Sequence, residues 1–114
     1  ADLGDVPSVA RQLESDAQRL RQTLEMLNDA HAAARTAGSD VPPDLQEVRE
    51  RTEQHLAEAV ASLETIRLGL LRLTTGAGTV ERFTTDLSAA ADVGDRIDRL
   101  MDGMGDVELL LRPT

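Results

Sequence analysis

The residues with the widest chemical range in this chain are its two histidines, His31 and His55. His31 falls in an apolar pattern of three-and-four spacing, so we expect it on the buried stripe of a helix. Arg49 lies on the stripe of a second helix, and a turn near residue 40 places it level with His31. Counting back along a third helix brings Asp98, or alternatively Asp102, to the same level. The sequence therefore predicts a polar layer of His31, Arg49 and Asp98.

Such a layer has two interpretations. It can act as a proton relay or a ligand-binding site between the helices. It can also fix the register of the helices, as buried polar residues do in coiled coils. We favour the structural role.

A metal centre is not expected. His55 lies about two helical turns from His31, too far for the two to share a metal directly. His55 and Glu58 make an H-x-x-E pair, whereas dinuclear carboxylate bundles need Glu-x-x-His from each of two helices. Asn28 and Thr52 occupy the positions where those glutamates would stand. The sequence therefore predicts neither a metal nor a cofactor.

Five aspartates recur near the end of the chain, at positions 92, 95, 98, 102 and 106. This spacing invites a divalent-cation site. However, arginines follow two of the aspartates at i,i+4, in the pairs 92–96 and 95–99, which is typical of a solvated, ion-paired helix face. The segment 102–106 also lacks the alternating acidic ligands of a calcium loop. We expect ion pairs here and no cation.

Nucleophilic catalysis is not expected either. The chain has no Cys, no Lys and no Tyr, and none of its five serines lies in a strand-turn-helix context that would expose a nucleophile. All twelve basic residues are Arg, the usage of a bacterial genome of high GC content. We predict that the chain is not an enzyme.

Charge excludes nucleic acid as a partner. Twenty-one acidic residues against twelve basic ones give a net charge of −9, which repels phosphate backbones. Phe83 is the single aromatic residue, so there is no platform on which bases could stack.

Three helices must position these residues. Apolar residues recur at helical spacing through residues 10–34, 45–73 and 80–104, and Gly/Pro clusters separate the stretches. We predict an all-α, antiparallel up-down-up three-helix bundle, with helices of about 30 residues over 6–37, 43–74 and 79–104 and a short tail over 105–114. The 114 residues form one domain, which we expect to be a piece of a longer protein because no initiator Met begins it.

The compartment is left open, with the cytoplasm as the default. No stretch reaches the ~20 apolar residues that a membrane span needs. The first residues show no basic region followed by an apolar one, so no signal peptide is recognisable.

Apolar surface remains after the bundle is built. Leu68 and Leu71 fall on the side of the second helix opposite its stripe, which continues through Ile66 and Leu70, so this end is apolar nearly all round. In the tail, a second apolar segment is expected to offer another contact. That segment contains Val107, Leu109, Leu110 and Leu111.

These features predict a non-enzymatic interaction or oligomerisation module that acts through apolar helix faces. A homodimer ranks first, a different protein partner second, and cover by the N-terminal segment 3–6 third. The alternative is a helical ligand-sensing domain with a small-molecule or pH-responsive site. That site would be the polar layer or a cavity beside the small residues Ala90, Ala91 and Gly94, although close packing is the default there.

Overall fold

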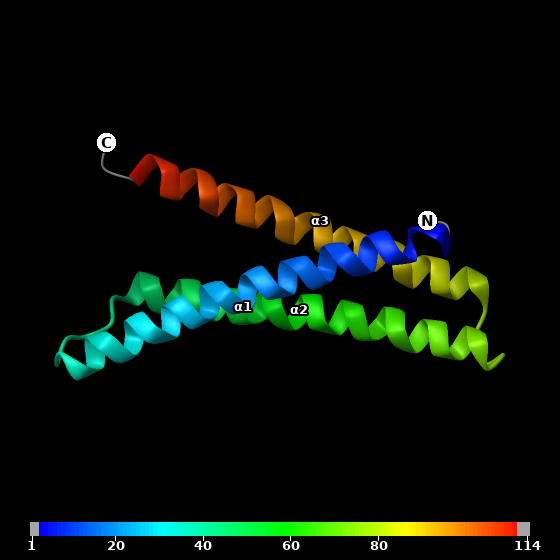
Figure 1. Ribbon diagram of the computed structural model, residues 1–114, viewed down its shortest axis with the longest axis horizontal. Coiled ribbons are helices and arrows are strands. Elements are labelled where there is room, and N and C mark those ends of the chain that lie inside the picture. The colour runs from blue at the N-terminus through cyan, green and yellow to red at the C-terminus, as the bar shows by residue number, and fades with distance from the viewer. Residues whose placement is uncertain (1–2, 112–114) are drawn as a thin grey trace.

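The computed structural model describes the backbone of residues 3–111 and the side chains of residues 4–102. A short 3₁₀ turn, η1 (Leu3–Asp5), leads into three α-helices: α1 (Val6–Thr36), α2 (Pro43–Thr74) and α3 (Val80–Leu111). The helices alternate in direction and pack against one another, and α1 and α2 lie side by side along most of their length (Figure 1). The predicted all-α, antiparallel three-helix bundle is confirmed.

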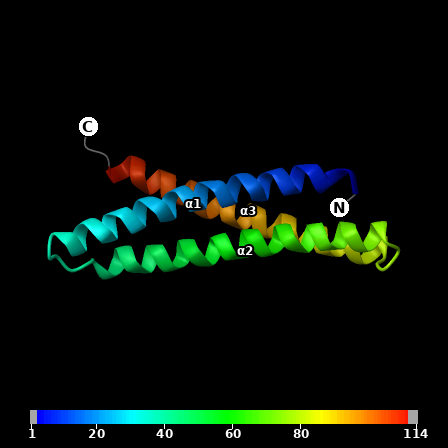
Figure 2. The same ribbon diagram turned by 60° about the horizontal axis from the view of Figure 1, so that its bottom comes forward.

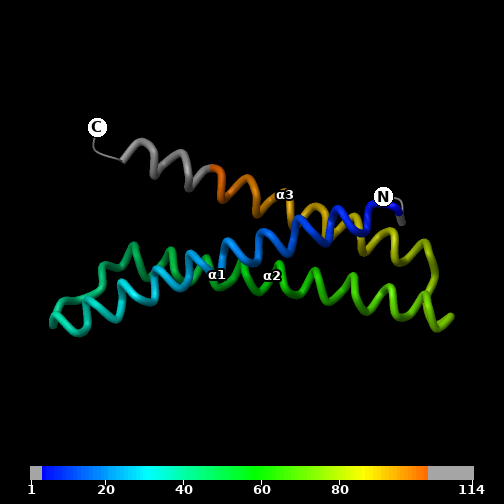
Figure 3. Tube along the Cα trace, in the orientation of Figure 1, coloured from blue at the N-terminus to red at the C-terminus, as the bar shows by residue number. Residues whose placement is uncertain are grey.

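Glycine ends both of the first two helices in the same way. Gly38 and Gly76 have φ values of 72° and 75°, in the left-handed region that favours glycine. After α1, the Ser39 N–H donates to the Ala34 carbonyl at 2.8 Å, and after α2 the Ala77 N–H donates to Arg72 at 2.8 Å. Both are Schellman motifs, which satisfy the last carbonyls and reverse the chain (Figure 3).

The predicted separate tail is wrong for residues 105–111, because α3 continues through Gly103 and Gly105 to Leu111. A helix interior tolerates glycine at a cost of about 1 kcal/mol each, and no proline lies between Val80 and Pro113 to stop the helix. The side chains of Val107, Leu109, Leu110 and Leu111 lie outside the described ones, and so does their predicted role as a contact.

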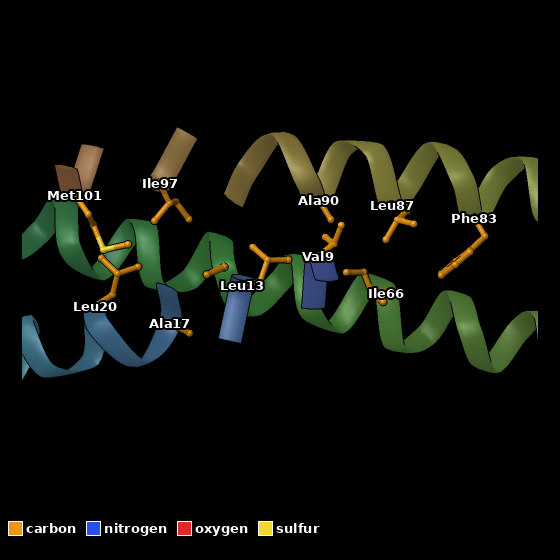
Figure 4. Close-up of a cluster of buried hydrophobic side chains, with 11 residues drawn as sticks. Val9, Leu13, Ala17, Leu20, Ile66, Phe83, Leu87, Ala90, Ile97 and Met101 are labelled. Atoms are coloured by element: carbon orange, nitrogen blue, oxygen red, sulfur yellow. The ribbon is translucent and has the colours of Figure 1, made fainter. Parts of the chain in front are cut away.

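The buried core lies where all three helices meet. Four large side chains, Leu13, Phe83, Leu87 and Ile97, are almost completely excluded from solvent. Around them, α1 contributes a stripe at three-and-four spacing that faces the other two helices (Figure 4). The remaining buried apolar residues are Val9, Ala17, Leu20, Ala59, Ile66, Ala90 and Met101.

Towards the α1–α2 turn, the packing becomes looser. No residue of α1 beyond Leu20 and none of α2 before Thr52 is buried, and the apolar stripe of Leu24 and Leu27 is only half-buried. The reason is geometric, since α3 crosses behind α1 at an angle and does not run parallel along the whole pair (Figure 2). The molecule is elongated, with extents of 57 × 30 × 17 Å.

Candidate functional site

The end of α2 exposes a cluster of leucines. Leu68, Leu70 and Leu71 are 42%, 40% and 52% exposed, and we call these three residues the α2 patch. The sequence places Leu68 and Leu71 away from the core, and the structure leaves both of them open to solvent. The described N-terminal backbone, from residue 3 onwards, does not cover them.

The sequence puts Leu70 on the buried stripe, and its exposure corrects that expectation. The residue has the helical phase of the core, but α1 begins only at Val6, and α2 extends beyond that end of α1 in both ribbon views (Figures 1 and 2). Among the described helices, only α3 therefore flanks the last turns of α2. As a result, Leu70 exposes apolar surface as well, on the side of α2 opposite Leu68.

A groove runs beside the patch between α2 and the start of α3. Its volume is about 270 Å³, and Leu68 forms part of one wall. The arginines Arg72 and Arg82 line it, with Asp86 as the one described acidic residue. The complete lining is Thr65, Leu68, Gly69, Arg72, Gly78, Thr79, Arg82, Phe83 and Asp86.

Gly69 allows the two helices beside this groove to approach closely. A β-carbon at this position would lie 2.5 Å and 2.8 Å from two ring carbons of Phe83. At the start of α3, the Arg82 N–H donates to the Thr79 hydroxyl at 3.2 Å, so Thr79 caps the helix. The ring of Phe83 is thus held against the backbone of α2.

Two members of the predicted polar layer do meet. His31 and Arg49 are half-buried and line the same pocket next to the α1–α2 turn, together with Leu27 and Leu45. This pocket holds only about 30 Å³, about the volume of a single water. The Arg49 Nε lies 3.5 Å from a carboxylate oxygen of Glu53 on its own helix and makes no hydrogen bond to a described residue.

Asp98 does not join them. Its carboxylate accepts a hydrogen bond at 2.7 Å from the side-chain amide of Gln12 and lies against Asp16. Asp16 and His31 are fifteen residues apart on one helix, about 22 Å at 1.5 Å per residue. The layer therefore contains two residues, because Asp98 is only eighteen residues from the start of α3, about 27 Å at 1.5 Å per residue, whereas His31 is twenty-five residues from the start of α1.

Asp16 and Gln12 form a polar cluster with α3 that the sequence analysis missed. The Gln12 amide also donates to Asp95 at 3.1 Å, so it bridges two carboxylates. Burial and the neighbouring Asp98 raise the pKa of Asp16 to about 7. The sequence does contain a signal for this burial, because Asp16 stands three residues after Leu13 and so falls on the same helix face. Ala17, four residues after Leu13, continues the apolar stripe equally well, and the sequence analysis assigned the stripe to Ala17.

The aspartates of α3 pair differently from the expectation. Arg96 reaches across to Glu58 of α2 at 3.2 Å instead of pairing with the aspartate four residues before it. Arg99 donates from Nε to the backbone carbonyl of Asp95 at 3.4 Å. Among the residues whose side chains are described, no three His, Cys, Asp or Glu residues are arranged to hold a metal ion.

A further cavity of about 120 Å³ lies among the three helices. Its walls are largely apolar, with Leu20 from α1, Val48 from α2 and Ile97 from α3. His55 also lines it, and the buried Nδ1 of this ring has no hydrogen-bond partner, although Glu58 is 3.8 Å away. Arg51 and Thr52 of α2 line it as well, so the cavity is an apolar space with polar side chains along its α2 wall.

None of the described helices has the length and apolar character of a membrane span. Comparisons with protein-family models, with curated proteins and with solved structures find no match for this chain.

Proposed function

We propose that this chain is a non-enzymatic interaction module that associates with a second copy of itself through the α2 patch. The observation that carries the proposal is the exposure of three leucines within four consecutive positions, Leu68, Leu70 and Leu71. Scattered exposed leucines need no partner, but Leu68 and Leu71 share one face of α2 while Leu70 is exposed on the other, and a helix end that is apolar nearly all round is typical of one that packs against a partner. Each leucine covered by a partner contributes about 25 cal/mol per Å² of apolar surface removed from water.

Charge favours a second copy as the partner. The chain carries a net charge of −9, yet the groove beside the patch has Arg72 and Arg82 against one acidic residue. A second acidic copy placed along this groove would bring carboxylates to these arginines, and such complementary charge steers association and orients the partners. A different acidic helix with an apolar stripe would satisfy the same chemistry, and it is the alternative partner.

The double variant Leu68→Glu/Leu71→Glu should reduce self-association at least tenfold. Two carboxylates in the patch would have to be desolvated on association. Thermal stability should change little, because both side chains are exposed in the monomer. The measurement is solution mass by light scattering over a hundredfold concentration range, with refractive-index detection because the chain has no Trp or Tyr.

The matched control is Met26→Glu/Leu45→Glu. It introduces the same two charges at exposed apolar residues near the α1–α2 turn, away from the patch, and should associate like the wild type. A wild type that stays monomeric throughout would exclude self-association. A wild-type dimer that the patch variant leaves intact would place the interface elsewhere.

A second candidate function is the binding of a small apolar acid in the cavity beside His55. The lining favours it, because the Arg51 guanidinium and a protonated His55 imidazole can donate to a carboxylate whose tail fills the apolar space. Hexanoate or benzoate should then raise the melting temperature as ligand concentration exceeds the dissociation constant. His55→Gln should abolish the rise, and the absence of any rise in the wild type would exclude this function.

A further inference from the structure

The contact between α1 and α3 contains an unusual pair of acids. Asp16 is only 2% exposed, and its Oδ2 accepts no hydrogen bond from any donor in the described part of the chain. Asp16 follows Gln12 by one helical turn on the same face of α1, and Gln12 donates to Asp98 at 2.7 Å, so the carboxyl groups of Asp16 and Asp98 are neighbours, and Asp98 raises the pKa of Asp16. Gln12 packs over the buried Gly94, and its amide holds Asp98 in place.

Two ionised carboxylates cannot hydrogen-bond to each other, because neither has a proton to donate. When one of them is protonated, it becomes a donor and the contact becomes a bond between the two helices. When both are ionised, two negative charges face each other in a site from which water is largely excluded. The same geometry is therefore attractive or repulsive, depending on a single proton.

The surrounding charges favour the protonated form of Asp16. Arg19 on α1 favours the ionised form of Asp16, whereas Asp95 and Asp98 on α3 oppose it. On α2, the titratable His55 lines the cavity next to Leu20, one turn further along α1, and is not among the groups that shift the pKa of Asp16. One arginine thus faces two aspartates around a buried carboxyl group.

We propose that Asp16 and Asp98 form a proton-operated clamp, in which a shared proton holds α3 against α1 and its loss drives the two helices apart. The clamp uses the contact between α1 and α3 and does not depend on self-association through the α2 patch. Its operating range agrees with the pKa of Asp16, which burial and Asp98 raise from 3.8 to about 7. The device would therefore respond near neutral pH, where ordinary aspartates are fully ionised.

The direction of the effect follows from linkage. The folded state binds the proton more tightly than the unfolded state, so the stabilisation is complete below about pH 4 and is lost as pH rises through about 7. Each unit of pKa difference changes the folding equilibrium tenfold, which amounts to as much as about a thousandfold in total. Opening would begin where α3 leaves α1, and would expose the apolar residues of the shared core.

The test measures the distance between α1 and α3 directly. The chain has no cysteine, so spin labels can be attached to Gln22→Cys on α1 and Leu100→Cys on α3, both exposed positions. Pulsed electron paramagnetic resonance should give one short distance at pH 5 and an additional, longer population at pH 8.5. In the Asp16→Asn background the short distance should persist at both pH values, because an amide can donate to Asp98 without titrating.

Two variants separate the clamp from other causes. Asp102→Asn removes the same charge from the neighbouring turn of α3 without touching the pair, and should leave the pH response intact. His55→Gln tests the nearby imidazole and should also leave it intact. The proposal is overturned if the wild-type distances do not change between pH 5 and 8.5, if the change survives in Asp16→Asn, or if His55→Gln abolishes it.

Discussion

Leu13→Ala should lower the free energy of unfolding by about 3–5 kcal/mol. Leu13 has no exposed surface and lies in the middle of the core that α1 shares with α2 and α3. Truncation removes buried methyl groups and leaves a cavity that three packed helices cannot close, which places the cost in the upper range for Leu→Ala changes. Urea denaturation followed by far-ultraviolet circular dichroism measures it, since the helices dominate that signal.

Two matched truncations test whether the stability is distributed as the burial suggests. Leu71→Ala, in the exposed patch, should change the free energy of unfolding by no more than about 0.5 kcal/mol. Leu27→Ala, in the half-buried stripe near the α1–α2 turn, should cost about 1–2 kcal/mol. Equal costs at Leu13 and Leu27 would mean that the core extends along the whole α1–α2 pair, contrary to the structure.

This gradient in packing has a consequence for the dynamics of the bundle. The half near the α1–α2 turn consists of two helices with only a half-buried seam, while the other half has three. Segments with few buried apolar contacts open locally at low free energy. We therefore expect amide exchange to be fastest near residues 30–48 and slowest around Leu13, Leu87 and Ile97.

The helices themselves could be predicted because their signals are local. Three-and-four spacing identifies the apolar stripes. Glycine favours the left-handed conformation that ends a helix, so Gly38 and Gly76 mark the turns, and among the described residues these two alone have positive φ. The end of α3 is less predictable, since Gly103 and Gly105 weaken a helix without stopping it. Local propensity does not decide between the end of a helix and its continuation at such positions.

The predicted layer required more than local signals. His31 and Arg49 meet because the first turn is short and fixes the register of α1 against α2. Asp98 was assigned by counting back from the expected end of the third helix. Its true neighbours are Gln12 and Asp16, because Asp98 lies only eighteen residues from the start of α3, a register between α3 and α1 that the pattern of a single helix does not encode.

Gly69→Ala should destabilise the protein by about 1–2 kcal/mol, although alanine is the better helix former. Helix propensity alone favours alanine over glycine by about 1 kcal/mol. The new β-carbon, however, would lie 2.5 Å from a ring carbon of Phe83, whose side chain is buried and cannot move without shifting its neighbours. Overpacking of this kind typically costs about 1–3 kcal/mol, and α3 would have to move away from α2.

Gly94, whose nearest neighbour is a flexible side chain and not an aromatic ring, provides the control. At Gly94 a β-carbon would meet the end of the Gln12 side chain at 3.2 Å, and Gln12 would have to shift by a few tenths of an ångström while it keeps its hydrogen bonds to Asp95 and Asp98. Gly94→Ala should therefore cost less than Gly69→Ala in the same urea experiment, because the helix propensity of alanine offsets this small shift. If both alanine variants were stabilising, α2 and α3 would not pack as closely at Gly69 as the structure shows.

The cause of the Gly69 effect can be isolated with a double-mutant cycle. Phe83→Ala alone should cost about 3–5 kcal/mol, because it removes a large, fully buried ring. In the Phe83→Ala background the clash no longer exists, so adding Gly69→Ala should become stabilising by up to about 1 kcal/mol through helix propensity and partial filling of the cavity. The change of sign gives a coupling energy of about 2–3 kcal/mol between the two positions. If the two changes were instead additive, the penalty at Gly69 would arise within α2 and not from its packing against α3.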